Sequence, residues 1–146
     1  MARATREAGD ALGIAFVAEA ERCPVCDGAL KVYKSRSRQV ITLTAGSFRA
    51  LETLKHGGED STHPAMGSNA LARQVVPRQR YGYDLIVHVG CARYLENKQR
   101  GEIQAELSRQ RGIALSTGSL SALCDRFLTY LEALHLARVP QLRAAL

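Results

Sequence analysis

Apolar residues in the last third of the chain recur at helical spacing. Their period predicts a long amphipathic helix over residues 116–137, whose apolar stripe consists of Leu120, Cys124, Phe127, Leu131 and Leu134. Ser116 and Thr117 offer an N-cap directly before it. Two further helices are expected over residues 84–96 and 98–110, and Gly112 stands where the second of them should end.

The first third of the chain has a strand-like pattern instead. Residues 30–35 and 39–44 contain β-branched and aromatic side chains and predict a hairpin that turns at Arg36-Ser37-Arg38. Residues 48–55 fit a strand or a short helix by pattern alone, and we favour a third strand. Residues 11–18 are expected to form a short helix or capping segment. Turn-forming residues dominate positions 57–70, so a boundary between two modules is expected there.

Composition narrows the classes to which the protein can belong. The chain has 146 residues, 46% of them hydrophobic and 23% charged, which is typical of a globular protein. Its net charge of +6 favours a polyanionic partner. The longest apolar run, residues 11–18, is far shorter than the ~20 residues of a membrane-spanning helix. Acidic Glu7 and Asp10 also argue against a secretory leader, so we expect a cytoplasmic protein with reduced thiols.

The most specific chemistry lies in Cys23-Pro-Val-Cys26, which is followed by Asp27-Gly28. Two thiolates around one tight turn form half of a tetrahedral zinc site, and His56 and His63 can complete one Cys2His2 site. A thiol oxidoreductase is an alternative, but its Cys-x-x-Cys opens a helix, whereas a glycine and a strand-like run follow here. Two unligated cysteines in a turn are the remaining alternative.

The predicted fold class is therefore α+β: a small antiparallel zinc-ribbon-like β module followed by an all-α helix-turn-helix module with a long C-terminal helix. The expected boundaries are residues 1–64 for the N-terminal segment and ribbon-like module, 65–80 for a basic linker, 81–138 for the helix-turn-helix module and 139–146 for a tail. No phosphate-binding or nucleophile motif is found in the sequence, and we expect no enzyme activity. Asp84, His88 and Cys91 share one helix face, but packing explains them better than a site does.

Double-stranded DNA is the expected partner, because positive charge, turn and helix order agree. In a helix-turn-helix the second helix enters the major groove by its N-terminal end. Hydroxyl side chains there can approach phosphates and base edges, and Lys and Arg supply phosphate contacts. The candidate DNA-binding residues are Lys31, Lys34, Arg36, Arg38, Arg78, Arg80, Thr117, Ser119, Ser121 and Arg126.

The order of these parts resembles the N-terminal region of bacterial insertion-sequence transposases. The resemblance spans most of residues 20–138 and is carried by Cys23–Cys26, Tyr81–Gly90, Glu102–Leu107 and Gly112–Leu120. It implies a zinc ribbon and helix-turn-helix that bind DNA, without the RNase H-like domain whose two metal ions cut DNA. It also implies a truncated protein near the bacterial nucleoid, working beside a catalytic transposase chain. A cysteine is expected after the third strand, where Lys55-His56-Gly57-Gly58 stands. Either His56 supplies the third ligand or the site has decayed, which would leave the ribbon weakly metallated or unfolded.

An interaction or regulatory protein is the alternative from another class. The long final helix would extend about 33 Å, longer than a recognition helix needs, and its stripe could form a homodimer seam.

Overall fold

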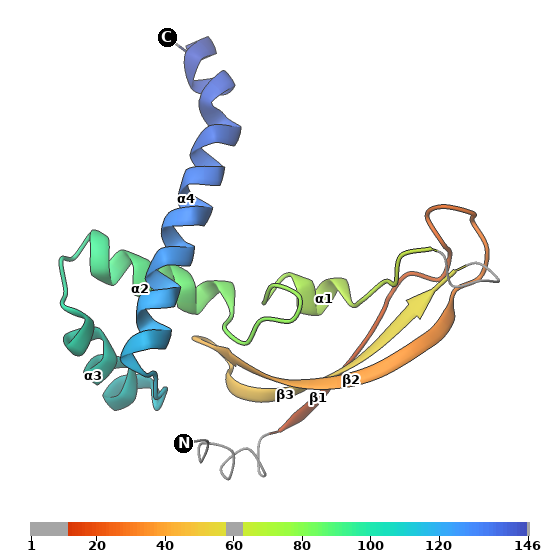
Figure 1. The fold of residues 1–146 in the computed structure, drawn as a ribbon, viewed down its shortest axis with the longest axis horizontal. Coiled ribbons are helices and arrows are strands. Elements are labelled where there is room, and N and C mark those ends of the chain that lie inside the picture. The colour runs from red at the N-terminus through yellow and green to blue at the C-terminus, as the bar shows by residue number, and fades with distance from the viewer. Residues whose placement is uncertain (1–11, 58–62, 146) are drawn as a thin grey trace. The chain divides into compact units, whose positions relative to one another are not determined.

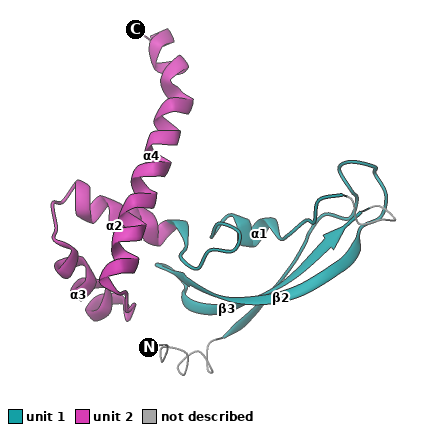
Figure 2. Ribbon diagram, viewed as in Figure 1, with its two compact units in different colours: residues 1–83 teal, residues 84–146 magenta. Residues whose placement is uncertain are grey.

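The computed structural model describes residues 12–57 and 63–145. The chain divides into two compact units, residues 1–83 and 84–146 (Figure 2). The first unit is a β-sheet with one short helix, and the second consists of helices only apart from its connecting turns. The predicted α+β class is confirmed.

A three-stranded sheet forms the first unit, with strand order β1-β3-β2. Strand β1 (Gly13–Val17) runs parallel to β3 (Gly46–His56), and β2 (Lys31–Thr42) pairs antiparallel with β3. The tight connection from β2 to β3 uses Gly46 at a φ of 70°, and the Thr42 side chain accepts a hydrogen bond from the Ala45 N–H at 2.9 Å. The predicted third strand is therefore confirmed as β3.

Two local predictions in this unit were wrong. Residues 13–17 form strand β1, where a helix or cap was expected. No turn occurs at Arg36-Ser37-Arg38, because β2 continues through these residues and turns only after Thr42. Arg36 and Arg38 lie on the same face of β2 as buried Val40 and Thr42, so the polar residues that suggested a turn follow the two-residue period of the strand.

Helix α1 (Asn69–Ala72) lies across the concave side of the curved sheet (Figure 1). Its Leu71, with Val75, joins an apolar core formed by Phe16, Val40, Phe48 and Ala50 of the sheet. The chain then returns to the sheet, where the Ile41 N–H donates to the Arg80 carbonyl at 2.8 Å. Residues 65–80 are thus an integral part of the first unit and not the expected linker, and the unit boundary falls after Tyr83.

Three helices make up the second unit: α2 (Tyr83–Tyr94), which begins on the last residue of the first unit, α3 (Arg100–Arg111) and α4 (Thr117–Ala145). These correspond closely to the expected helices. Helix α3 ends at Gly112, which has a φ of 65°, and Ser116 caps α4 by accepting the Ser119 N–H at 3.1 Å. Helix α4 continues through Pro140 into the expected tail.

The second unit has its own apolar core. Its fully buried side chains come from all three helices and are Leu85, Ile86, Val89, Ile103, Leu107, Leu120 and Leu123. Among residues 12–57 and 63–145, no helix is both long and apolar enough to cross a membrane.

Candidate metal centre and basic surfaces

The turn that contains Cys23 and Cys26 is held by its own backbone. The Cys23 N–H donates to the Gly28 carbonyl and the Asp27 N–H donates to the Cys23 carbonyl, both at 2.8 Å. Asp27 takes a φ of 57°, the left-handed conformation that Asp tolerates better than most residues. Because the backbone bends so tightly here, both sulfur atoms point to the same region.

His63 reaches these sulfur atoms from 40 residues further along the chain. Its Nδ1 lies 3.3 Å from the Cys23 Sγ, and the ligand atoms of Cys23, Cys26 and His63 all lie within 4.8 Å of one another. Among the described residues, this is the only group of three or more Cys, His, Asp or Glu side chains whose ligand atoms lie so close together. The structure therefore brings together three of the four predicted metal ligands in a group that could hold a metal ion.

His56 is the predicted ligand that the structure leaves out of this group. It is the last residue of β3, and its ring packs edge-on against Tyr33, with ring centroids 5.0 Å apart. His56 pairs with Lys31 of β2 in the sheet, and its ring lies against Tyr33 of the same strand.

Gly57 follows His56 and lets the backbone approach the cysteine turn closely. A Cβ atom at this position would lie 2.5 Å from the Cys23 Cβ and 2.7 Å from its Sγ. Real Cβ atoms do not come this close, so the residue after β3 must be glycine for this packing to form. Cys23 itself is only 3% exposed.

The cysteine turn also favours the thiolate form that a metal requires. The backbone N–H groups of Cys26 and, to a smaller extent, Val25 lower the pKa of the Cys23 thiol, although burial opposes this effect. The thiolate is the form that binds metals, so the turn prepares Cys23 for coordination before an ion arrives.

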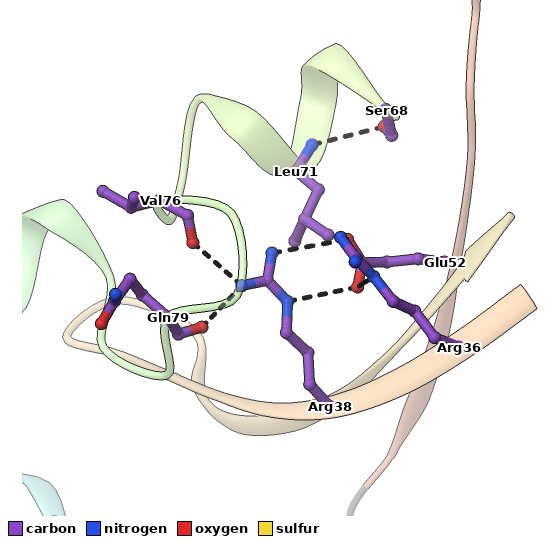
Figure 3. Close-up of polar contacts among 7 residues, drawn as sticks. All are labelled: Arg36, Arg38, Glu52, Ser68, Leu71, Val76 and Gln79. Atoms are coloured by element: carbon purple, nitrogen blue, oxygen red, sulfur yellow. Dashed lines mark hydrogen bonds and ion pairs between the residues drawn. The ribbon is translucent and has the colours of Figure 1, made fainter. Parts of the chain in front are cut away.

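Two of the predicted DNA-binding arginines are engaged within the first unit. Figure 3 shows Arg36 and Arg38 converging on Glu52 between the sheet and α1. Arg36 Nε lies 3.0 Å and Arg38 Nε 3.3 Å from the buried Glu52 carboxylate. Arg38 Nη1 also donates to the carbonyls of Val76 at 2.9 Å and Gln79 at 2.7 Å. Burial lowers the pKa of Arg38, but an arginine remains charged.

Arg38 therefore has a structural explanation: it ties β2 to the loop after α1. The other predicted basic residues of this unit are exposed at the surface; they are Lys31, Lys34, Arg78 and Arg80. Arg78 occupies the left-handed region at a φ of 64°.

At the start of α4, the predicted residues differ in how accessible they are. Thr117 is exposed, whereas Ser119 and Arg126 are half-buried. The Ser121 hydroxyl accepts a hydrogen bond from Arg100 Nη1 at 2.7 Å. This contact places the Arg100 guanidinium beside the first turns of α4. Nothing in the local sequence pattern connects Arg100 with Ser121, 21 positions away, so only the structure reveals this pairing.

The remaining cysteines belong to the packing of the second unit. Cys124 is buried in α4, and burial raises the pKa of its thiol, so the neutral form is favoured. Cys91 is half-buried on α2.

No family model matches this sequence, and comparisons with curated proteins and with solved structures likewise found no match.

Proposed function

We propose that this protein is a zinc-containing, double-stranded DNA-binding protein of the kind that precedes the catalytic domain of insertion-sequence transposases. The observation that carries the zinc assignment is the gathering of Cys23, Cys26 and His63 from two distant segments. Two thiolates and an imidazole form a donor set that suits Zn²⁺ better than Mg²⁺ or Ca²⁺, which prefer oxygen ligands. The three protein donors leave one tetrahedral position for a further ligand.

The spacing of the ligand atoms is compatible with this choice of metal. Typical Zn–S and Zn–N distances of ~2.3 and ~2.0 Å place a sulfur and a nitrogen ligand about 3.5 Å apart around a tetrahedral ion. The Cys23 Sγ and His63 Nδ1 atoms lie 3.3 Å apart, close to that value. When bound, zinc would cross-link the cysteine turn to the segment after β3 and stabilise this end of the sheet.

DNA binding is supported by the way α3 and α4 are joined. Residues 112–116 form a short connection in which Ile113 and Leu115 are buried, and Gln104 Nε2 donates to the Leu115 carbonyl at 2.6 Å. A short glycine-containing turn that holds two helices at a fixed angle is typical of a helix-turn-helix. In this reading α4 is the recognition helix.

The chemistry at the start of α4 fits contact with a DNA backbone. Thr117 offers an exposed hydroxyl group, the helix dipole adds partial positive charge at this end of α4, and Arg100 adds a full positive charge beside Ser121. In the first unit, exposed Lys31, Lys34, Arg78 and Arg80 provide further phosphate contacts.

Duplex binding is tested by fluorescence anisotropy with labelled random-sequence DNA over a range of salt concentrations. We expect affinity to fall steeply as salt increases, because bound phosphates release counterions. Arg100→Ala should weaken binding and reduce the salt dependence. Arg138→Ala is the matched control, since Arg138 is also an exposed arginine of the second unit but lies near the far end of α4. No binding at low salt, or equal losses in the two variants, would contradict the proposal.

A second candidate function, self-association through α4, rests on a separate observation. Leu131 and Leu134 are 49% and 52% exposed, and Leu128 and Leu142 continue the same side of the helix. Helix propensity alone gives little stability to the exposed C-terminal part of α4 in water. An apolar seam with α4 of a second copy would explain why leucines line one side of it.

Light scattering distinguishes the two oligomeric states. We expect a dimer that becomes a monomer in the Leu131→Glu/Leu134→Glu double variant. Ala133→Glu introduces a charge on the opposite side of α4 and should leave the dimer intact. A wild-type protein that is monomeric at every concentration tested would rule out this seam.

A further inference from the structure

A cavity of about 700 Å³ lies within the first unit, between the concave face of the sheet, the segment before α1 and the loop after it. This volume is within the range of about 300–1,000 Å³ that is usual for small-molecule sites. The pair of arginines in Figure 3 forms part of its wall. Neither zinc binding nor contact between α4 and a duplex makes use of this space.

The charge of the cavity wall is strongly biased. Four basic residues line it, Lys34, Arg36, Arg38 and Arg78, against one acidic residue, Glu52. Glu52 is already bound by both arginines, with nitrogen–oxygen distances of 3.0 and 3.3 Å. The wall thus has a net charge of +3, obtained from four positive groups and one negative group. Glu52 holds Arg36 in place and leaves the positive charge in excess.

The arrangement along β2 directs this charge into one space. Lys34, Arg36 and Arg38 alternate along the strand, so they lie on the same face, opposite Leu54 and Glu52 of β3. Arg38 uses its Nη1 on the Val76 and Gln79 carbonyls, but Lys34 is an exposed side chain and Arg36 is half-buried. Lys34 and Arg36 are therefore the cations best placed to meet a ligand.

Most of the remaining wall is apolar, apart from Ser68 and Asn69, and it includes an aromatic ring. Leu54, Met66, Leu71 and Val75 line the interior, and Tyr33 is half-exposed at the cavity. Apolar surface beside several cations fits a ligand that combines an anionic group with a flat hydrophobic body. A phosphate beside a nucleobase is such a ligand, because bases stack on aromatic side chains and phosphates pair with arginine and lysine.

We propose that this cavity binds a phosphorylated nucleoside, with its phosphate at Lys34 and Arg36 and its base against the apolar wall. The source is either a free mononucleotide or an unpaired nucleotide of a single strand, which share this chemistry. A base pair within an intact duplex does not fit, since its two phosphates and both bases belong to a rigid double helix wider than the space. Lys34 and Arg78 also serve the duplex-binding proposal as phosphate contacts. Nucleotide binding is measured without a duplex, so either proposal can fail alone.

Isothermal titration calorimetry of the full chain tests the site with four probes: adenosine monophosphate, adenosine, inorganic phosphate and a short single-stranded oligodeoxyadenylate. We expect adenosine monophosphate to bind at least about tenfold more tightly than either of its parts, because charge pairing and stacking both contribute. Tighter binding of the oligonucleotide would identify a strand as the source, and tighter binding of the mononucleotide a free nucleotide.

Variants assign the binding to this cavity. Lys34→Ala should weaken the mononucleotide about tenfold, the effect expected on losing one charge-assisted contact, and Arg36→Ala at least as much. Lys34 is exposed, so its loss should not disturb folding. Arg49→Ala is the matched control, because Arg49 is an exposed cation on β3 that does not line the cavity. No binding of either nucleotide at millimolar concentration, or equal effects of Lys34→Ala and Arg49→Ala, would overturn the proposal.

Discussion

Replacing Gly90 with alanine tests how closely α2 and α4 pack in the second unit. A Cβ atom at position 90 would lie 2.0 Å from Phe127 Cγ and 2.3 and 2.4 Å from the two adjacent ring carbons. Carbon atoms in ordinary contact are ~3.5–4.0 Å apart, so the ring or the helix must move by about 1.5 Å. The ring cannot simply swing aside at no cost, since Phe127 is also stacked on Tyr94, with planes 12° apart.

The magnitude follows from two opposing effects. Overpacking a well-filled core costs about 1–3 kcal/mol, and here the overlap involves the root of the ring, which favours the upper part of that range. Alanine gains up to about 1 kcal/mol over glycine through helix propensity. We therefore expect Gly90→Ala to lower the free energy of unfolding by about 1–2 kcal/mol, a fall of several degrees in the melting temperature of a small domain.

Gly101→Ala supplies a control with the opposite sign. Gly101 lies in α3, and a Cβ atom added there would meet nothing within 4 Å. Gly101 is the second residue of α3, so this variant should be stabilised by less than the ~1 kcal/mol that alanine gains over glycine in a helix interior. Urea unfolding followed by circular dichroism measures both changes. If Gly90→Ala stabilises the protein as Gly101→Ala does, the contact with Phe127 is wrong. Combining Gly90→Ala with Phe127→Leu should recover part of the loss, because the two residues share one space.

Three further predictions concern the first unit. The Ser68 hydroxyl and two backbone N–H groups lower the pKa of Glu19 from 4.5 to about 2, so its contribution to stability is complete above pH 4.5 and is lost as the pH falls towards 2. Glu19→Gln should remove this part of the acid sensitivity, as measured by thermal melts at neutral pH and near pH 3. Unchanged acid sensitivity in this variant would contradict the prediction. Arg38→Met should lower the free energy of unfolding in urea by about 2–3 kcal/mol, because it leaves buried polar partners without a hydrogen bond. The exposed control Arg49→Met should lower it by less than about 0.5 kcal/mol. Similar losses in the two variants would show that Arg38 does not tie β2 to the loop after α1. Gly57→Ala should weaken zinc binding about 10–100-fold, which is the range for residues that orient metal ligands. A competition with a chelator measures this affinity. An unchanged affinity would show that the close approach of the backbone to Cys23 is not needed.

The helices of the second unit could be predicted from the sequence, because their signals are local. The apolar stripe of α4 repeats every three or four residues, and Gly112 and Ser116 mark the end of α3 and the start of α4. The expected helix ended at residue 137, whereas α4 continues through Pro140 to Ala145, because the apolar stripe that predicted the helix ends at Leu134.

The sheet was harder to predict because its charged residues find partners far away in the sequence. Arg36 and Arg38 suggested a surface turn, and only the buried Glu52, 16 and 14 residues distant, explains why a strand can carry them inward. Strand β1 is too short for its period to differ from that of a helix. Helix α1 spans four residues within a turn-rich segment and depends on Glu19, about 50 residues earlier, for its start.

The metal ligands were only partly predictable, because the cysteine turn is a local signal but the position of a histidine depends on the fold. The Cys-x-x-Cys turn is a local signal, and His63 was correctly placed beside it. His56 was chosen by its position in the sequence, but the strand that ends with it turns its ring towards Tyr33.

Elemental analysis of purified, fully reduced protein tests the central claim most directly. We predict one zinc ion per chain, lost in Cys23→Ser and in His63→Ala but retained in Cys91→Ser, which removes a half-buried thiol outside the group. Metal-free protein whose first unit is nevertheless folded, or an equal zinc content in the Cys23→Ser and Cys91→Ser variants, would contradict the account.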